Sequence, residues 1–121
     1  MLYNCPMLID HHAILARKLR VLFPEEDARA EAVALLALYG AEVHEREPER
    51  VHLAVLKLSG FDLEAMRTNL DLARHDYRDV LMMAEYPAQA SRPTWAMAPD
   101  SPELKALMEE DRRQYAAWLA E

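Results

Sequence analysis

The chain contains few of the residues that several common kinds of site require. Its 121 residues include a single cysteine, Cys5, and two glycines. One cysteine excludes an internal disulfide framework and is typical of a protein from a reducing compartment. Two glycines cannot build a phosphate-binding loop, and no serine stands in a G-x-S-x-G turn. These absences argue against a nucleotide-binding loop and against the nucleophile turn of an α/β-hydrolase.

Positive charge and long apolar runs are also scarce. The chain has 14 lysines and arginines against 21 aspartates and glutamates, so its formal net charge is −7. An acidic surface repels phosphate backbones, and we therefore expect no nucleic-acid partner. No apolar stretch approaches the ~20 residues that a membrane helix needs. Residues 1–12 lack a basic segment followed by an apolar run, so we expect no membrane partner and a cytoplasmic location.

The residues that are present favour α-helices. Hydrophobic residues make up 52% of the chain, which is enough for a core, and alanine, leucine, glutamate and arginine dominate. Straight-chain residues lose little rotamer freedom in a helix, and the valine- and threonine-rich runs that strands prefer are missing. We predict an all-α fold, a small helical bundle of four helices plus a C-terminal helix, built around an antiparallel helix hairpin.

Prolines, glycines and capping residues mark the first two helices. Asp10 is a suitable N-cap for a helix that should end before Pro24. A second helix is expected from Pro24 to Tyr39, since Gly40 can adopt the left-handed backbone that stops a helix.

The first arm of the hairpin begins near Pro48 and runs to Ser59. It has almost no polar face, so we expect it to be the most buried helix. Residues 51–58 could also form a β-strand. The proline at the start, the Ser59-Gly60 stop and the absence of a partner strand favour a helix.

The most regular pattern in the chain lies between residues 62 and 85. Apolar residues recur there in steps of three and four, which is typical of a helix packed along another helix. With Asp62 as the N-cap, we predict one continuous helix that ends at Glu85. The apolar stripe consists of Leu63, Met66, Leu70, Ala73, Tyr77, Val80 and Ala84.

The end of this long helix is apolar on nearly every side. Five apolar residues follow one another from Val80 to Ala84, and an exposed helix end should not be apolar all round. We therefore expect another helix of this chain, a second copy or a protein partner to cover it. Homodimerisation through this end is our specific hypothesis.

The C-terminal third of the chain is expected to be less tightly integrated. We assign residues 1–88 to the helical bundle domain and residues 89–121 to a proline-containing linker with a C-terminal helix. That helix should begin at Ser101, a good N-cap followed by proline, and should carry Glu109 to Arg113 on its outward side. It packs either on the bundle or on a partner.

Three short segments carry a resemblance. They are Arg50-Val51-His52-Leu53-Ala54-Val55-Leu56-Lys57-Leu58-Ser59, then Asp76-Tyr77-Arg78-Asp79-Val80-Leu81, then Ala84-Glu85-Tyr86-Pro87. They lie within residues 50–87, which make up about a third of the chain, and this region resembles a group of small uncharacterised bacterial proteins with no assigned activity. The resemblance implies a bacterial origin and transfers no catalytic residue.

One set of side chains could bind a metal ion. Asp71, His75 and Asp79 recur every four residues on one side of the predicted long helix. A histidine and a carboxylate one turn apart can share an ion. However, Asp71 and Asp79 would lie about 12 Å apart along the axis, so at most one pair could chelate. The alternative is a solvent-facing side with Arg67–Asp71 and His75–Asp79 pairs, and we prefer it.

A second set of side chains could contact a protein partner. Tyr77 falls on the apolar stripe, and Arg74 and Asp76 flank it, where they could reach the preceding helix or a second chain. The alternative is that these residues only fix the packing of the hairpin, and we prefer it. The candidate partner-binding residues are Arg74, Asp76, Tyr77, Leu81, Met82, Met83 and Trp118.

The remaining histidines and Cys5 give weaker signals. His11 and His12 are adjacent and would diverge by about 100° on a helix, so they should not share a metal ion. No second histidine follows His44 at the spacing of a zinc-protease motif. His52 is expected to be a hydrogen-bonded core histidine. No basic neighbour marks Cys5 as a nucleophile.

The sequence therefore favours a protein that acts by contact. We expect a non-enzymatic protein–protein interaction or oligomerisation module, with no catalytic residue and no cofactor, and with a protein partner or self-association. The alternative is a metal- or small-ligand-binding helical protein that uses His75 with Asp71 or Asp79.

Overall fold

The computed structural model describes residues 10–121, and within that range the chain consists of helices and loops without a strand. This agrees with the all-α prediction. Cys5 lies outside the described residues. The elements are α1 (His11–Leu22), α2 (Glu26–Leu36), α3 (Pro48–Ser59), α4 (Leu63–His75), α5 (Tyr77–Glu85), α6 (Pro87–Ala90), the 3-10 helix η2 (Thr94–Ala96) and α7 (Pro102–Ala120).

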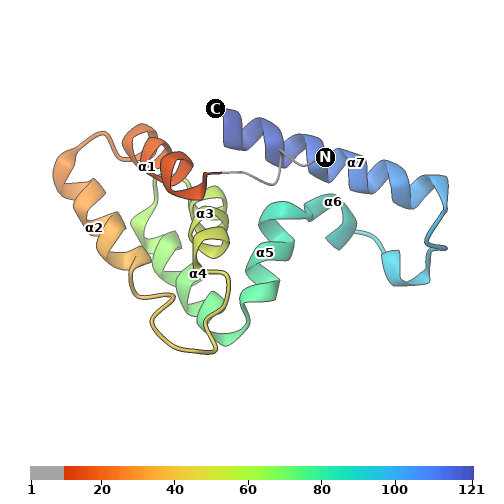
Figure 1. The fold of residues 1–121 in the computed structure, drawn as a ribbon, viewed down its shortest axis with the longest axis horizontal. Coiled ribbons are helices and arrows are strands. Elements are labelled where there is room, and N and C mark those ends of the chain that lie inside the picture. Colours follow the sequence, from red (N-terminus) through yellow and green to blue (C-terminus); the bar gives the residue numbers. More distant parts are fainter. Residues whose placement is uncertain (1–9) are drawn as a thin grey trace.

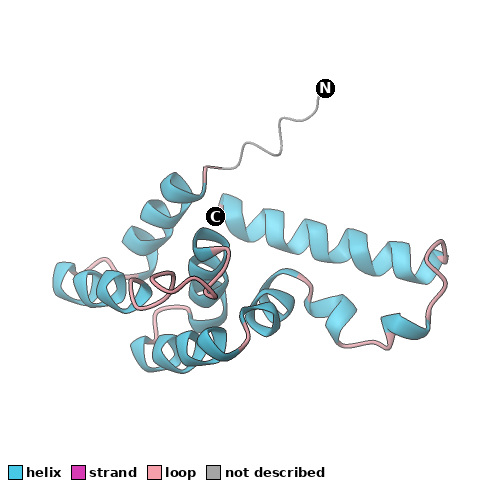
Figure 2. Cartoon of the chain, turned by 60° about the horizontal axis from the view of Figure 1, so that its bottom comes forward, coloured by secondary structure: helices cyan, strands magenta, loops and turns pink. Residues whose placement is uncertain are grey.

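The first five helices form one body, and the sixth and seventh follow as an arm. Helix α3 lies at the centre and contacts α1, α4 and α5 (Figure 1). The chain then leaves the body through α6 and η2, and α7 runs back over α5 and α6 toward α1 (Figure 2). None of the described helices combines the length and the apolar character that crossing a membrane would require.

Helix α3 is the most buried element, as predicted. Its side chains Val51, Leu53, Val55 and Leu56 are at most 1% exposed, and the β-strand alternative for residues 51–58 is wrong. His52 on the same helix donates a hydrogen bond from its Nε2 atom to the Tyr39 carbonyl at 3.0 Å. The predicted hydrogen bond is present, although His52 is half-buried rather than within the core.

The predicted continuous helix from Asp62 to Glu85 is interrupted, which corrects the sequence analysis. Asp76 has extended backbone (φ −155°, ψ 98°) and is at once the C-cap of α4 and the N-cap of α5. Its carboxylate accepts the backbone N–H of Arg78 at 3.1 Å. A short carboxylate competes for backbone N–H groups and so favours caps over helix interiors. That competition explains the break.

The apolar stripe survives the break. Met66, Leu70 and Ala73 in α4 and Val80 and Ala84 in α5 are all at most 3% exposed. The spacing of apolar residues therefore predicted which side is buried, although it did not predict that the two halves belong to different helices. The reason is that burial follows the local helical period, whereas continuity depends on each residue's own backbone preference.

The second helix is shorter than predicted. It ends at Leu36 rather than Tyr39, and Tyr39 is 2% exposed within the core. Gly40 has the predicted positive φ (112°), and a Cβ atom there would lie 2.9 Å from the Cβ of Pro48. The chain turns early so that the loop after α2 can close against the start of α3.

Helix α7 packs on the same chain at two points. Its only buried residue is Asp111, at 1% exposure. The prediction that Glu109 to Arg113 face outward is therefore wrong at this position. The Asp111 carboxylate accepts the backbone N–H groups of Ala88 at 2.8 Å and Gln89 at 3.0 Å, in the first turn of α6. It thus supplies the cap that α6 lacks from its own sequence.

The second contact joins the C-terminal end of α7 to α1. Lys18 is 3% exposed and donates to the Trp118 carbonyl, and Arg17 donates to the Leu119 carbonyl. The Lys18 ammonium also lies 4.3 Å from the centre of the Trp118 ring. Cations suit the negative end of a helix dipole and the face of an indole, so these contacts hold α7 against the bundle.

The apolar end of the hairpin is largely covered by this chain itself. Val80, Leu81 and Ala84 are at most 6% exposed, whereas Met82 and Met83 are 42% and 40% exposed. Cover comes from α3, α4 and α7. The apolar surface that was expected to be open all round is reduced to the two methionines.

Replacing Leu70 tests the packing of α4. Leu70→Asp would bury an unpaired charge in the core, since Leu70 is 2% exposed. We expect a loss of about 3 kcal/mol or more in the free energy of unfolding, measured by urea denaturation. The control His75→Ala removes a side chain that contacts only the Asp71 carbonyl at 2.8 Å, and it should cost less than ~0.5 kcal/mol. Equal losses in the two variants would contradict this packing.

Candidate functional site

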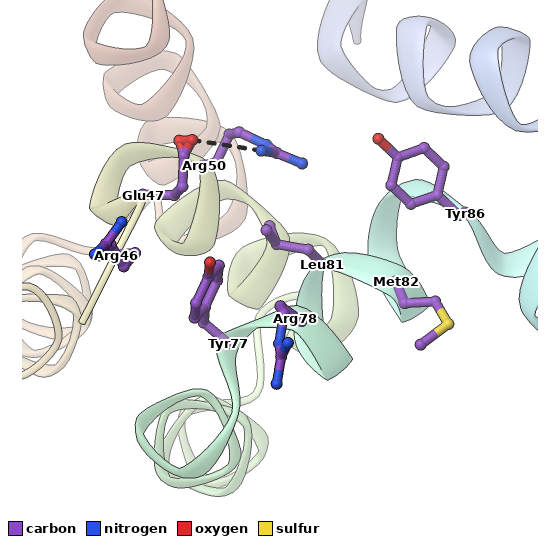
Figure 3. A pocket seen from close by; sticks show the side chains of 8 residues that line it. All are labelled: Arg46, Glu47, Arg50, Tyr77, Arg78, Leu81, Met82 and Tyr86. Carbon is purple, nitrogen blue, oxygen red and sulfur yellow. Dashed lines mark hydrogen bonds and ion pairs between the residues drawn. The ribbon is translucent and has the colours of Figure 1, made fainter. Parts of the chain in front are cut away.

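Two depressions lie side by side next to the end of α5. We call the first the arginine pocket; it has a volume of about 670 Å³. The second, the α7 groove, has a volume of about 960 Å³. The arginine pocket is lined by Arg46, Glu47, Arg50, Tyr77, Arg78, Leu81, Met82 and Tyr86 (Figure 3). The α7 groove is lined by His11, Arg50, Glu85, Tyr86, Gln89, Lys105, Met108, Glu109, Asp111, Arg112, Tyr115, Ala116 and Leu119.

Arg50 and Tyr86 line both depressions, so the two adjoin one another. Arg50 of α3 donates to the Glu85 carboxylate of α5 twice, from Nη2 at 2.6 Å and from Nε at 3.1 Å. Glu85 is 7% exposed, and its hydrogen bond raises the pKa of Arg50 further above its ordinary value. Arg50 therefore keeps its charge, and its two hydrogen bonds to Glu85 fix α5 to α3 between the two depressions.

The arginine pocket gathers positive charge from three parts of the chain. Arg46 comes from the loop before α3, Arg50 from α3 itself and Arg78 from α5 (Figure 3). Arg78 forms an ion pair with Asp76 at 3.0 Å. Glu47 is the only acidic residue of the lining and lies 3.5 Å from Arg50. Arginines therefore outnumber acidic side chains in this lining, on a chain whose net charge is −7.

A buried carboxylate shapes the loop that carries Arg46. Glu45 is 5% exposed, and its Oε1 atom accepts the N–H groups of Gly40, Ala41 and Glu42 at 2.9, 3.1 and 3.2 Å. These bonds, led by that from Gly40, hold the pKa of Glu45 below its ordinary value. Three N–H donors on one oxygen close the loop into a fixed turn.

The backbone beside the pocket is in an uncommon conformation. Glu47 has φ 53° and ψ 50°, the left-handed region that non-glycine residues seldom adopt. Such a residue costs on the order of 1–3 kcal/mol. Neighbouring side chains on an extended strand point to opposite sides, whereas the left-handed turn lets Arg46 and Glu47 line the same pocket.

The α7 groove is mainly apolar, with charged side chains at its rim. Tyr86 and Met108 are 43% and 50% exposed, and Tyr115 stacks on Trp118 with ring centres 5.9 Å apart. Burial raises the pKa of Tyr115, so its hydroxyl stays protonated at neutral pH. At the rim, a hydrogen bond from Arg112 lowers the pKa of Glu109 to about 2. The groove can therefore accept apolar groups between ionised edges.

The predicted partner-binding residues are only partly brought together. Tyr77, Leu81 and Met82 line the arginine pocket, whereas Met83 lines neither depression. Arg74 and Asp76 are positioned elsewhere, because Arg74 pairs with Glu45 at 3.4 Å and Asp76 caps α5. Trp118 packs against the core and beneath Lys18.

The residues considered for a metal site are not gathered. Within residues 10–121, no group of three or more histidine, cysteine, aspartate or glutamate side chains could hold a metal ion. His75 ends α4 and Asp79 belongs to α5. The predicted Arg67–Asp71 pair is replaced by an ion pair between Arg67 and Glu31 of α2. His12 pairs with Glu49 at 2.5 Å.

Sequence reasoning missed three residues that line the two depressions, Arg46, Tyr86 and Asp111. Asp111 stands in the charged run Glu109 to Arg113, which looks like a solvated helix face. Arg46 stands in a charged loop and gave no periodic signal. Only Tyr86 offered a clue, since it directly precedes Pro87 and so ends α5 at a defined place.

Comparisons of the chain with protein-family models, with curated proteins and with solved structures gave no match. The residues and geometry described above therefore carry the functional argument.

Replacing Asp111 tests how α7 is held. Asp111→Ala leaves the half-buried N–H groups of Ala88 and Gln89 without their acceptor. We expect a loss of about 2 kcal/mol or more in the free energy of unfolding, with faster hydrogen exchange at these two amides. The exposed neighbour Glu110 provides the control, and Glu110→Ala should change neither quantity appreciably. Unchanged exchange in Asp111→Ala would disprove the capping role.

Replacing Glu45 gives a pH-dependent prediction. A pKa lowered on folding stabilises the fold above the ordinary glutamate value, and this stabilisation is lost as the pH falls through the lowered pKa. The Glu45→Gln variant should therefore have a lower melting temperature than the wild type at neutral pH. The difference between the two melting temperatures should be smaller at about pH 3. Circular dichroism at both pH values measures this. Glu42→Gln, whose side chain is exposed, should show no such dependence, and a constant gap for Glu45→Gln would count against the role.

Proposed function

We propose that this chain is a non-enzymatic interaction module that binds a short segment of a protein partner. The segment lies along the concave surface formed by the arginine pocket and the α7 groove. The observation that carries this proposal is that the two depressions adjoin, since Arg50 and Tyr86 line both. A surface of this shape can accept an extended or helical segment rather than a single small group.

The exposed side chains of this surface have the composition of an interface. Met82, Tyr86 and Met108 are each 42–50% exposed and line the depressions. Methionine adapts its shape to different partners, and tyrosine and arginine are enriched at interface centres. Exposed apolar surface rimmed by polar residues marks interaction sites on proteins.

The charged groups of the surface support recognition rather than a reaction. Arg50 is held by Glu85, Arg78 by Asp76 and Arg112 by Glu109. An arginine held in such a pair keeps its charge and has a fixed direction, which favours selective binding. These pairs support the non-enzymatic part of the proposal.

A partner other than a second copy is favoured at this surface. Two copies would each carry a net charge of −7 and would repel one another at long range. The apolar end of α5, on which the homodimer hypothesis rested, is reduced to Met82 and Met83. As part of the same proposal, the single cysteine and the acidic composition suit a cytoplasmic protein, and the resemblance noted above suits a bacterial one.

Selection from a peptide library tests this function. Peptides displayed on phage are panned against the immobilised protein, and the enriched sequences are synthesised for calorimetric titration. We expect the enriched peptides to contain aromatic or aliphatic residues. Their dissociation constants should rise about tenfold or more for Tyr86→Ala, because a central aromatic anchor contributes about 2 kcal/mol. Circular dichroism establishes that Tyr86→Ala is folded.

The control replaces an exposed aromatic residue away from the surface. Trp95 is 88% exposed and lines neither depression, so Trp95→Ala should bind the same peptides as the wild type. Enrichment of no peptide, or an equal loss of affinity in Tyr86→Ala and Trp95→Ala, would overturn the proposed function.

A further inference from the structure

One side chain of the arginine pocket is left without an ionic partner. Glu85 and Glu47 engage Arg50, and Asp76 engages Arg78. Among residues 10–121, no carboxylate lies within ion-pair distance of Arg46. Its guanidinium carries five N–H donors in a planar fork that matches a carboxylate. Arg46 is therefore the one arginine of this lining that is free to pair with a carboxylate from outside the described residues.

The backbone of Arg46 is held in place by neighbouring residues. The Tyr39 hydroxyl donates to the Arg46 carbonyl at 2.7 Å, and burial raises the pKa of Tyr39 to about 12. The neighbouring Glu45 holds the loop through three N–H groups. The backbone of Arg46 is therefore held in place while its side chain is exposed, and a fixed backbone reduces the entropy lost on binding.

The positive end of the α3 dipole lies beside the same pocket, and the first turn of the helix carries one acidic side chain, Glu49. The helix has 12 residues, begins beside the pocket at Pro48, and no side chain caps its N-terminal end. The free N–H groups of a first turn favour a negative group, since they form the positive end of the helix dipole. Glu47 and Arg50, which line the pocket, lie at this end of the helix.

The apolar part of the lining strengthens electrostatic interactions made in the pocket. Tyr77, Leu81 and Met82 form the side of the pocket opposite the α3 end (Figure 3). Apolar walls exclude water and lower the local dielectric constant, so an arginine–carboxylate contact gains strength there.

We propose that the arginine pocket is a carboxylate-binding subsite in which Arg46 is the principal carboxylate-binding residue. This assignment rests on the proposed function and adds the chemistry of the partner. The bound segment presents an aspartate, a glutamate or a C-terminal carboxylate to Arg46. An apolar neighbour of that group crosses Tyr86 and enters the α7 groove.

Titration followed by nuclear magnetic resonance tests the subsite without a protein partner. The probes are N-acetylphenylalanine, which carries a carboxylate, and N-acetylphenylalaninamide, which does not. We expect saturable shifts of the backbone amides of Arg46, Tyr77 and Arg78 with the carboxylate alone. In Arg46→Gln the dissociation constant should rise about tenfold, because hydrogen bonds to charged groups are the stronger ones.

The control and the competing anion sharpen the result. Arg92 is paired with Glu103 outside both depressions, so Arg92→Gln should leave the titration unchanged. Inorganic phosphate provides a further arm. Tighter binding of phosphate than of the carboxylate at these amides would overturn the assignment, as would equal shifts with the amide probe or an unchanged constant in Arg46→Gln.

Failure of the subsite and failure of the proposed function give different results. If selected peptides bind through Tyr86 but N-acetylphenylalanine does not bind near Arg46, the carboxylate subsite is disproved and the proposed protein-binding function is retained. If N-acetylphenylalanine binds but no peptide is enriched, the pocket is a carboxylate site and the proposed protein-binding function is disproved.

Discussion

The burial of α3 constrains every other part of the structure. Residues 51–56 have almost no polar surface apart from His52, so this helix must be covered on nearly all sides. Helices α1, α4 and α5 provide that cover. The N-terminal end of α3 stays at the surface, and the loop closed by Glu45 brings Arg46 to it. The arginine pocket is therefore a consequence of how the core is completed.

Buried carboxylates decide the geometry outside the core. Glu45 closes the loop before α3, Glu85 ties α5 to α3, and Asp111 caps α6 from α7. Each accepts at least two hydrogen bonds, which offsets the cost of burying a charge. Because α7 is held mainly by such directional contacts, its apolar side is only half-buried, and the α7 groove remains between it and α5.

The sequence predicted the fold well wherever a local rule was sufficient. Asp10, Asp62 and Ser101 cap helices as expected, since capping involves only the next three residues. The break at Asp76 was missed because the apolar period passes through it undisturbed. The candidate site was predicted only in part: Tyr77, Leu81 and Met82 line the pocket, but Arg46 joins them from a distant loop and Tyr86 from the end of α5.

What the sequence by itself determined is the helical class and the buried side of α3, α4 and α5, because both follow from local propensity and from the spacing of apolar residues. Only the tertiary structure decided that Asp111 is buried, that Lys18 lies against the end of α7, and that two depressions meet at Arg50 and Tyr86. These arrangements join residues that are about 20 to 100 positions apart in the sequence. Such pairings leave no periodic mark in the chain, since each depends on where the helices come to rest in space.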